Sequence, residues 1–95
     1  MGRLVIMAYY VYVLRSSVSG RLYKGVTDDV TRRLREHNDG RSASTKHWRP
    51  WEIVYVETCA SRTEAVRRER YLKTGKGREE LQNILDRALV KASQA

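Results

Sequence analysis

Residues 8 to 26, AYYVYVLRSSVSGRLYKGV, decide the fold of this chain. Tyrosine and β-branched valine dominate the first part, and strands favour both residue types. The cluster SSVSG over residues 16–20 is typical of the turn between two strands of a hairpin. We therefore predict antiparallel strands over residues 8–15 and 21–26.

The register of this hairpin depends on the centre of its turn. If the turn is centred between Ser17 and Val18, Tyr12 and Tyr23 lie directly opposite each other. Two phenols would then share one face of the sheet.

The apolar or aromatic run from Leu4 to Leu14 superficially resembles the core of a signal peptide. A helix that spans a bilayer needs roughly 20 residues, and this run has about eleven. Its three tyrosines, its β-branched valines and the hairpin that follows favour a strand. We therefore expect a cytoplasmic protein without a membrane segment.

The segment after the hairpin carries the signals of a first helix. Thr27-Asp28-Asp29 supplies cap residues, the helix is predicted to continue to about Asn38, and Gly40 marks its end. Helical spacing places four positions on the stripe that faces the core: Val30, Arg33, Leu34 and His37. Two of these four positions are polar.

A loop, a strand and two helices complete the chain. The small, polar and basic segment Arg41 to Arg49 predicts an exposed loop, and Pro50 precedes a strand over Trp51 to Glu57. The capping-box spacing of Ser61 and Glu64 predicts a helix to about Thr74. Its core-facing stripe contains Ala65, Val66, Glu69 and Leu72.

The final helix is predicted over residues 78–90, after a break at Gly75 and Gly77. Its apolar positions have the spacing of core packing: Leu81, Ile84, Leu85, Ala88 and Leu89. The order β-β-α-β-α-α predicts an α+β domain in which helices flank a three-stranded antiparallel sheet. Its 95 residues suit one domain, 1–95, with a core over about 8–90.

Composition narrows the classes of function. The only cysteine, Cys59, cannot form an internal disulfide, and two histidines beside it are too few for a four-ligand zinc site. The net charge of +8 favours a polyanionic partner, either nucleic acid or an anionic membrane surface.

Arg33, His37 and Glu69 lie on helix stripes where apolar residues belong. Buried charge is costly unless it is paired or used. One interpretation is that Arg33 and Glu69 form a structural ion pair and that His37 is an edge residue with satisfied hydrogen bonds. Three such residues beside two tyrosines favour a functional site instead.

The residue types suit phosphate chemistry. A Glu69 carboxylate suits Mg²⁺ or Mn²⁺, which needs few protein ligands when phosphate and water supply the others. The planar fork of Arg33 matches phosphate oxygens, and His37 transfers protons near neutral pH. Tyrosine hydroxyls position water and phosphate. Together these groups describe phosphodiester hydrolysis with one divalent metal ion.

Four motifs follow one another along the chain: Tyr10-Val11-Tyr12, Tyr23-Lys24-Gly25, Arg33 with His37 four residues later, and Glu69 within RRERYLK. This ordered set resembles the GIY-YIG nuclease superfamily, and the stretch from about Tyr9 to Leu85 is similar to small stand-alone GIY-YIG domain proteins. Tyr10 replaces the first glycine of the family pattern, and Lys24 replaces the second isoleucine. Asn83 is only a loose match to an asparagine that several relatives carry.

The resemblance implies a metal-dependent nuclease fold with a single divalent cation bound by Glu69. Tyr12 and Tyr23 would orient or activate the attacking water. Arg33 would stabilise the pentacovalent phosphate, with assistance from His37. Gly25 would make room where the backbone nears the site, and a plain strand-end glycine is the alternative.

Substrate contact would come from basic residues around the proposed site: Arg41, Lys46, Arg49 and Lys73. Trp48 in the same loop could stack on an unpaired base. The alternative is that these residues are solvated surface charges. Such a surface gives salt-dependent affinity with little sequence specificity.

Three hypotheses about function follow. The first is a metal-dependent endonuclease that acts on DNA rather than RNA, in repair or in processing of branched or single-stranded ends. The second is a nucleic-acid-binding module that retains the nuclease fold without cleavage. The third is a basic protein that binds RNA or ribonucleoprotein. The complete set of Tyr, Tyr, Arg, His and Glu favours the first.

Overall fold

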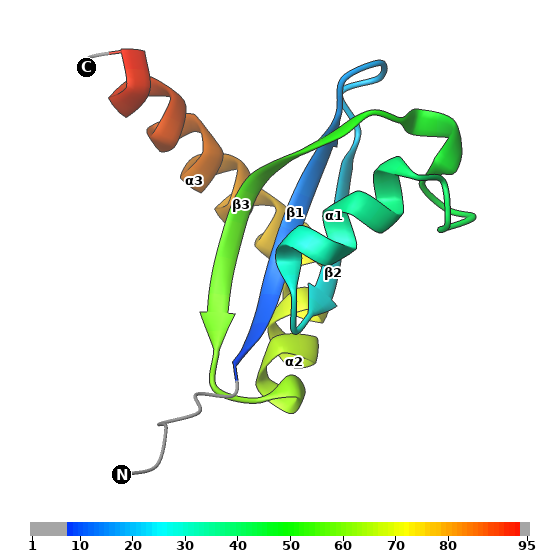
Figure 1. Cartoon of the computed structure of the whole chain (residues 1–95). Coiled ribbons are helices and arrows are strands. Elements are labelled where there is room, and N and C mark those ends of the chain that lie inside the picture. Colours follow the sequence, from blue (N-terminus) through cyan, green and yellow to red (C-terminus); the bar gives the residue numbers. More distant parts are fainter. Residues whose placement is uncertain (1–7, 94–95) are drawn as a thin grey trace, which may run out of the picture.

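The computed structural model describes residues 8–93, and its elements follow the predicted order β-β-α-β-α-α (Figure 1). The elements are β1 (Tyr9–Ser16), β2 (Leu22–Thr27), α1 (Val30–Asn38), the 3₁₀ turn η1 (Lys46–Trp48), β3 (Trp51–Cys59), α2 (Arg62–Leu72) and α3 (Gly75–Ser93). The antiparallel sheet has the order β2-β1-β3, with α1 on one face and α2 and α3 on the other. Within residues 8–93, no helix is long and apolar enough to cross a membrane.

The hairpin forms as predicted, but the centre of its turn lies one residue later, so the pairing of the two strands shifts by two residues. Ser16 still belongs to β1, and its hydroxyl oxygen accepts hydrogen bonds from two turn amides. Tyr12 therefore pairs with Gly25, and Tyr23 pairs with Leu14. The predicted direct opposition of Tyr12 and Tyr23 is wrong, although both phenols do share one face, with ring centroids 6.2 Å apart.

The two faces of the sheet bury different kinds of residue. Toward α2 and α3 the fully buried side chains are aliphatic, or small and apolar: Val11, Val13, Cys59, Ala65, Leu72 and Leu81. Toward α1 the buried cluster is Tyr12, Leu14 and Trp51, with Tyr23, Val30, Leu34 and Trp48 packed against it. The face toward α1 is thus rich in aromatic side chains that also carry polar atoms.

The segment from Arg41 to Arg49 is not the fully exposed loop that its composition predicts. Thr45 is completely buried, and Trp48 is half-buried against the aromatic cluster. The Trp51 indole N–H donates to the Thr45 carbonyl over 2.9 Å, which ties this segment to the start of β3. β3 itself continues to Cys59, two residues beyond the predicted end at Glu57.

Helix caps are formed largely as expected. The Asp29 side chain accepts from the Arg32 amide at the start of α1, and Ser61 accepts from the Glu64 amide at the start of α2. The Glu64 carboxylate, however, accepts from the amide of Ala60 instead of the cap residue itself. Both helices therefore begin close to the positions that their cap residues predict.

The junction between the last two helices differs from the prediction. α2 ends at Leu72, and α3 begins at Gly75, so both glycines lie within the first turn of α3. A side chain at Gly77 would collide with the Tyr71 backbone carbonyl, because the two helices approach closely here. Gly77 is needed for helix packing and does not break a helix.

The end of α3 was also predicted incorrectly. Leu81 is buried and Leu85 is partly buried, but Ala88 is exposed, and Leu89 is 72% exposed. Figure 1 shows the reason, since the C-terminal half of α3 extends past the sheet. Apolar periodicity marks one helix face, and that face stays exposed where nothing within residues 8–93 covers it.

Candidate active site

Tyr12 lies at the centre of the polar cluster on the α1 face of the sheet. It is 2% exposed, and its ring lies over Gly25 of the neighbouring strand. A Cβ atom at position 25 would collide with the phenol, so only glycine leaves room for this ring. The middle strand therefore fixes one hydroxyl group in a set position.

A chain of hydrogen bonds connects this phenol to the loop after α1. The Tyr12 Oη and His37 Nε2 atoms are 2.8 Å apart, and His37 Nδ1 lies 2.8 Å from Thr45 Oγ1. Thr45 Oγ1 also makes a longer contact of 3.4 Å to the Ser42 carbonyl, to which it donates. Because the Thr45 hydroxyl donates to Ser42, His37 Nδ1–H donates to Thr45. His37 Nε2 then accepts the hydrogen bond that the Tyr12 hydroxyl donates.

The protonation states agree with this direction of hydrogen bonding. Burial lowers the pKa of His37 to about 4, and the positive charge of Arg33 acts in the same direction. Burial raises the pKa of Tyr12 to about 12, although nearby Arg33 opposes the shift. At neutral pH the pair is therefore a neutral phenol that donates to a neutral imidazole.

Tyr23 completes the aromatic part of the cluster. Its ring centroid lies 4.9 Å from that of His37, in an edge-to-face arrangement, and 6.3 Å from that of Trp51. Such contacts fix ring orientation, because aromatic rings favour tilted packing. Tyr23 is half-buried, whereas Tyr12 is buried.

Arg33 supplies the positive charge beside the phenols. Its Nη1 atom lies 3.2 Å from Glu36 Oε1 on the same helix. Burial lowers the pKa of the guanidinium, but hydrogen bonding to Tyr12 and Glu36 outweighs this and raises it. The suggested Arg33–Glu69 ion pair is wrong, since Arg33 pairs with Glu36 and Glu69 pairs with Lys73.

Glu69 lies on α2, the helix that packs on the opposite face of the sheet. Its side chain is only 14% exposed, and its Oε1 atom forms an ion pair with the Lys73 ammonium. Within residues 8–93 this oxygen has no partner with hydrogen-bond geometry. Lys24 on β2 is close enough for its pKa to be affected by Glu69. Within residues 8–93 the one ion pair of Glu69 is with Lys73, and no described contact joins it to Tyr12 or Arg33.

The donor set restricts how a metal could bind. In the described part of the chain, no three His, Cys, Asp or Glu side chains gather into a metal cage. A covered carboxylate oxygen without a hydrogen-bond partner suits a hard cation that takes its other ligands from phosphate and water. Glu69 is therefore the side chain that could hold Mg²⁺ or Mn²⁺ if Lys73 moves aside.

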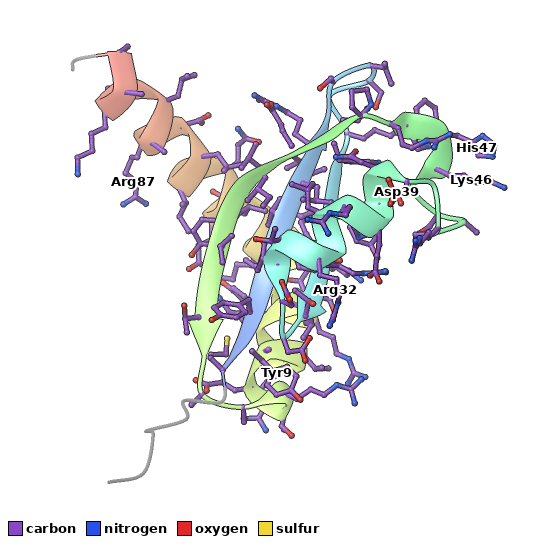
Figure 2. All side chains as sticks on the ribbon, viewed as in Figure 1. Tyr9, Arg32, Asp39, Lys46, His47 and Arg87 are labelled. Carbon is purple, nitrogen blue, oxygen red and sulfur yellow. The ribbon has the colours of Figure 1, made fainter. Side chains whose placement is uncertain are left out.

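The basic residues predicted to bind nucleic acid do not form one group. Arg41, Lys46 and Arg49 are exposed in the segment after α1, and Figure 2 shows Lys46 beyond the C-terminal end of that helix. Lys73 lies at the end of α2, where it pairs with Glu69. The Arg21 guanidinium lies 4.1 Å from the ring centroid of Trp48, so one face of that indole is already covered.

Sequence reasoning missed Thr45 and Glu36. Thr45 sits in a small polar segment without periodicity, so nothing in the sequence indicates that its hydroxyl meets His37. Glu36 follows Arg33 by three residues, and this helical spacing is a signal that could have been used. Asn83 is exposed on α3, and its backbone carbonyl accepts from Arg87.

The fold and this cluster define a class of small α+β domain in which phenols of the sheet lie beside an imidazole and a guanidinium of the first helix. Residues 8–83 match the family described as the GIY-YIG catalytic domain. A UPF0213 protein from Desulfotalea psychrophila is 38% identical over 89 residues, which cover 92% of this chain and 74% of the relative. A UPF0213 protein from Staphylococcus epidermidis is 39% identical over 77 residues, 80% of this chain and 93% of the relative.

A solved structure agrees with these relatives. The solution structure of a UPF0213 protein from Bacillus halodurans is similar with a TM-score of 0.50 and 33% identity, over 82% of this chain and 85% of that one. The chain therefore belongs to the GIY-YIG family and, within it, to the small UPF0213 proteins.

Proposed function

We propose that this protein is a divalent-metal-dependent endonuclease that hydrolyses phosphodiester bonds in DNA with little sequence specificity. Membership of a family described as a catalytic domain supports a nuclease. The observation that carries the proposal is the buried chain from Tyr12 through His37 to Thr45, beside Arg33. A module without catalysis has no need of polar groups in such positions.

Tyr12 and Tyr23 orient the attacking water in this proposal. The Tyr12 hydroxyl donates its hydrogen bond to His37, so its lone pairs remain available to accept a hydrogen bond from water. His37 is neutral at physiological pH because its pKa is lowered to about 4, so its Nε2 atom can accept this hydrogen bond and hold the phenol in position.

Arg33 stabilises the charge that develops on the phosphate. Its guanidinium stays protonated, since its pKa is raised, and Glu36 pairs with it while about a third of the side chain stays exposed. A fixed cation aimed at developing negative charge is typically worth more in the transition state than in substrate binding. Arg33 would therefore act mainly on turnover.

Glu69 is the proposed ligand of the divalent cation. The cation would polarise the phosphate and lower the pKa of a bound water. Lys73 competes for the same carboxylate, since its ammonium pairs with Glu69. This pair is also the observation that favours the second candidate, a nucleic-acid-binding module without cleavage.

The test uses labelled single-stranded, duplex and branched DNA, incubated with Mg²⁺, Mn²⁺ or chelator. Wild-type protein should cleave only with metal, and Glu69→Ala should abolish cleavage while salt-sensitive binding is largely retained. Glu79→Ala, which removes an exposed carboxylate from α3, is the matched control and should cleave normally. Equal cleavage by wild type and Glu69→Ala would reject Glu69 as the metal ligand. Binding without cleavage by wild type would favour the second candidate.

A further inference from the structure

The outer surface of α2 carries arginines that the proposed chemistry leaves unused. Arg62, Arg67 and Arg70 are exposed, and within residues 8–93 none of them has an ion-pair partner. Together with Thr63 and half-buried Val66 they line a hollow on this helix. Three unpaired cations on one helix surface repel one another, so they favour a polyanion.

The fourth arginine of α2, Arg68, has a structural role. Arg68 faces inward, where its guanidinium pairs with Glu57 on β3 at 2.9 Å and with Glu80 on α3 at 3.3 Å. These hydrogen bonds raise the pKa of Arg68 despite its burial. Arg62, Arg67 and Arg70 have no such partners, so the fold does not account for them.

A second hollow connects this surface to the candidate active site. It is lined by Arg62 from α2, by Arg33 from α1, and by Tyr9 and Thr27 at the neighbouring strand ends. Figure 2 shows Tyr9 at the end of the sheet near α2. Two carboxylates also line this hollow, but Asp28 pairs with Arg32 and Glu36 pairs with Arg33, so neither is paired with Arg62.

We propose that Arg62, Arg67 and Arg70 form a track for the phosphodiester backbone of nucleic acid, continuous through Arg62 with Arg33. This inference rests on the proposed function and adds the surface that holds the substrate beside the scissile phosphate. Guanidinium groups contact phosphate oxygens without reading base edges. The track therefore binds DNA through charge, and its contacts show as dependence of affinity on salt.

The experiment measures binding of a labelled 20-base-pair DNA duplex in chelator, over a series of salt concentrations. The double variant Arg67→Gln and Arg70→Gln removes two charges from the track. The control, Arg87→Gln with Lys91→Gln, removes two exposed charges from the far end of α3, where Figure 2 shows Arg87. The track variant should weaken binding about tenfold at low salt and lower the slope of log K against log salt by about 2.

The control should retain nearly the wild-type slope. Equal losses in both double variants, or no loss in the track variant, would overturn the track. If wild type cleaves DNA while the track variant keeps the wild-type slope, only the track is rejected. If the track variant loses its slope but wild type never cleaves, the track stands and the proposed activity fails.

Discussion

The two faces of the sheet bury different kinds of side chain. The face toward α2 and α3 buries Val11, Val13, Leu72 and Leu81, side chains without polar atoms that only have to exclude water. The face toward α1 buries a histidine, and every polar atom of its ring has a partner. The face toward α2 and α3 is therefore packed with apolar side chains, and the face toward α1 can hold chemically useful groups because they satisfy one another.

The largest expected effect is a loss of stability caused by a substitution on the face toward α2 and α3. Leu72→Ala removes a fully buried side chain and should lower the free energy of unfolding by about 2–5 kcal/mol, measured by urea denaturation. Leu34→Ala on the α1 side is the control, and its half-buried side chain should cost less. An equal or greater loss from Leu34→Ala would contradict the expected dependence of this loss on burial.

The next effect concerns catalysis on the polar face. Arg33→Ala should lower turnover by about 10²–10³-fold, as expected for a group that stabilises transition-state charge, with a smaller change in DNA affinity. Arg35→Ala removes an exposed arginine from the same helix and should leave turnover near wild type. If Arg33→Ala reduced affinity and turnover equally, Arg33 would be a phosphate anchor only.

The buried imidazole predicts a pH dependence of stability. Because the pKa of His37 is lowered from 6.5 to about 4, the unfolded chain binds a proton that the folded chain does not. The free energy of unfolding therefore keeps its full His37 contribution above about pH 6.5. It falls as the pH decreases toward 4, by up to about 1.4 kcal/mol per pH unit. Urea denaturation between pH 5 and 7 measures this slope.

The two histidines offer a matched comparison for that slope. His37→Gln should flatten it, whereas His47→Gln, in which an exposed side chain is replaced, should retain it. A steep slope that survives in His37→Gln would assign the dependence to other groups.

The smallest effect concerns the end of the hydrogen-bond chain. Thr45→Val keeps the shape of the side chain but leaves His37 Nδ1–H without an acceptor, which should cost about 1 kcal/mol in urea denaturation. Thr45→Ser retains the hydroxyl and should stay closer to wild type. A valine variant as stable as the serine variant would show that this hydrogen bond does not position His37.

Local signals in the sequence predicted the elements well. Asp29 and Ser61 cap the helices that they were expected to cap, because capping depends on a few neighbouring residues. The hairpin register was missed since the Ser16 hydroxyl contacts two turn amides, an interaction that residue spacing does not reveal.

Long-range features were harder to predict. Tyr12, Arg33 and His37 could be placed on the α1 side of the sheet from helix and strand periodicity. Thr45 could not be, because its burial depends on how an irregular segment folds back over α1 and β3. Leu89 was assigned to the core since periodicity identifies an apolar face without telling whether another element covers it.

One measurement tests most directly whether the Tyr12 hydroxyl on the α1 face takes part in cleavage. Tyr12→Phe removes the hydroxyl that contacts His37, and Tyr55→Phe removes one that donates to Glu57 from the β3 strand on the aliphatic side. Cleavage of labelled DNA with Mg²⁺ is compared for both variants and wild type, after each is confirmed to be folded. We predict that the cleavage rate falls by at least about 10²-fold in Tyr12→Phe and stays near the wild-type rate in Tyr55→Phe. Wild-type cleavage by Tyr12→Phe would contradict it.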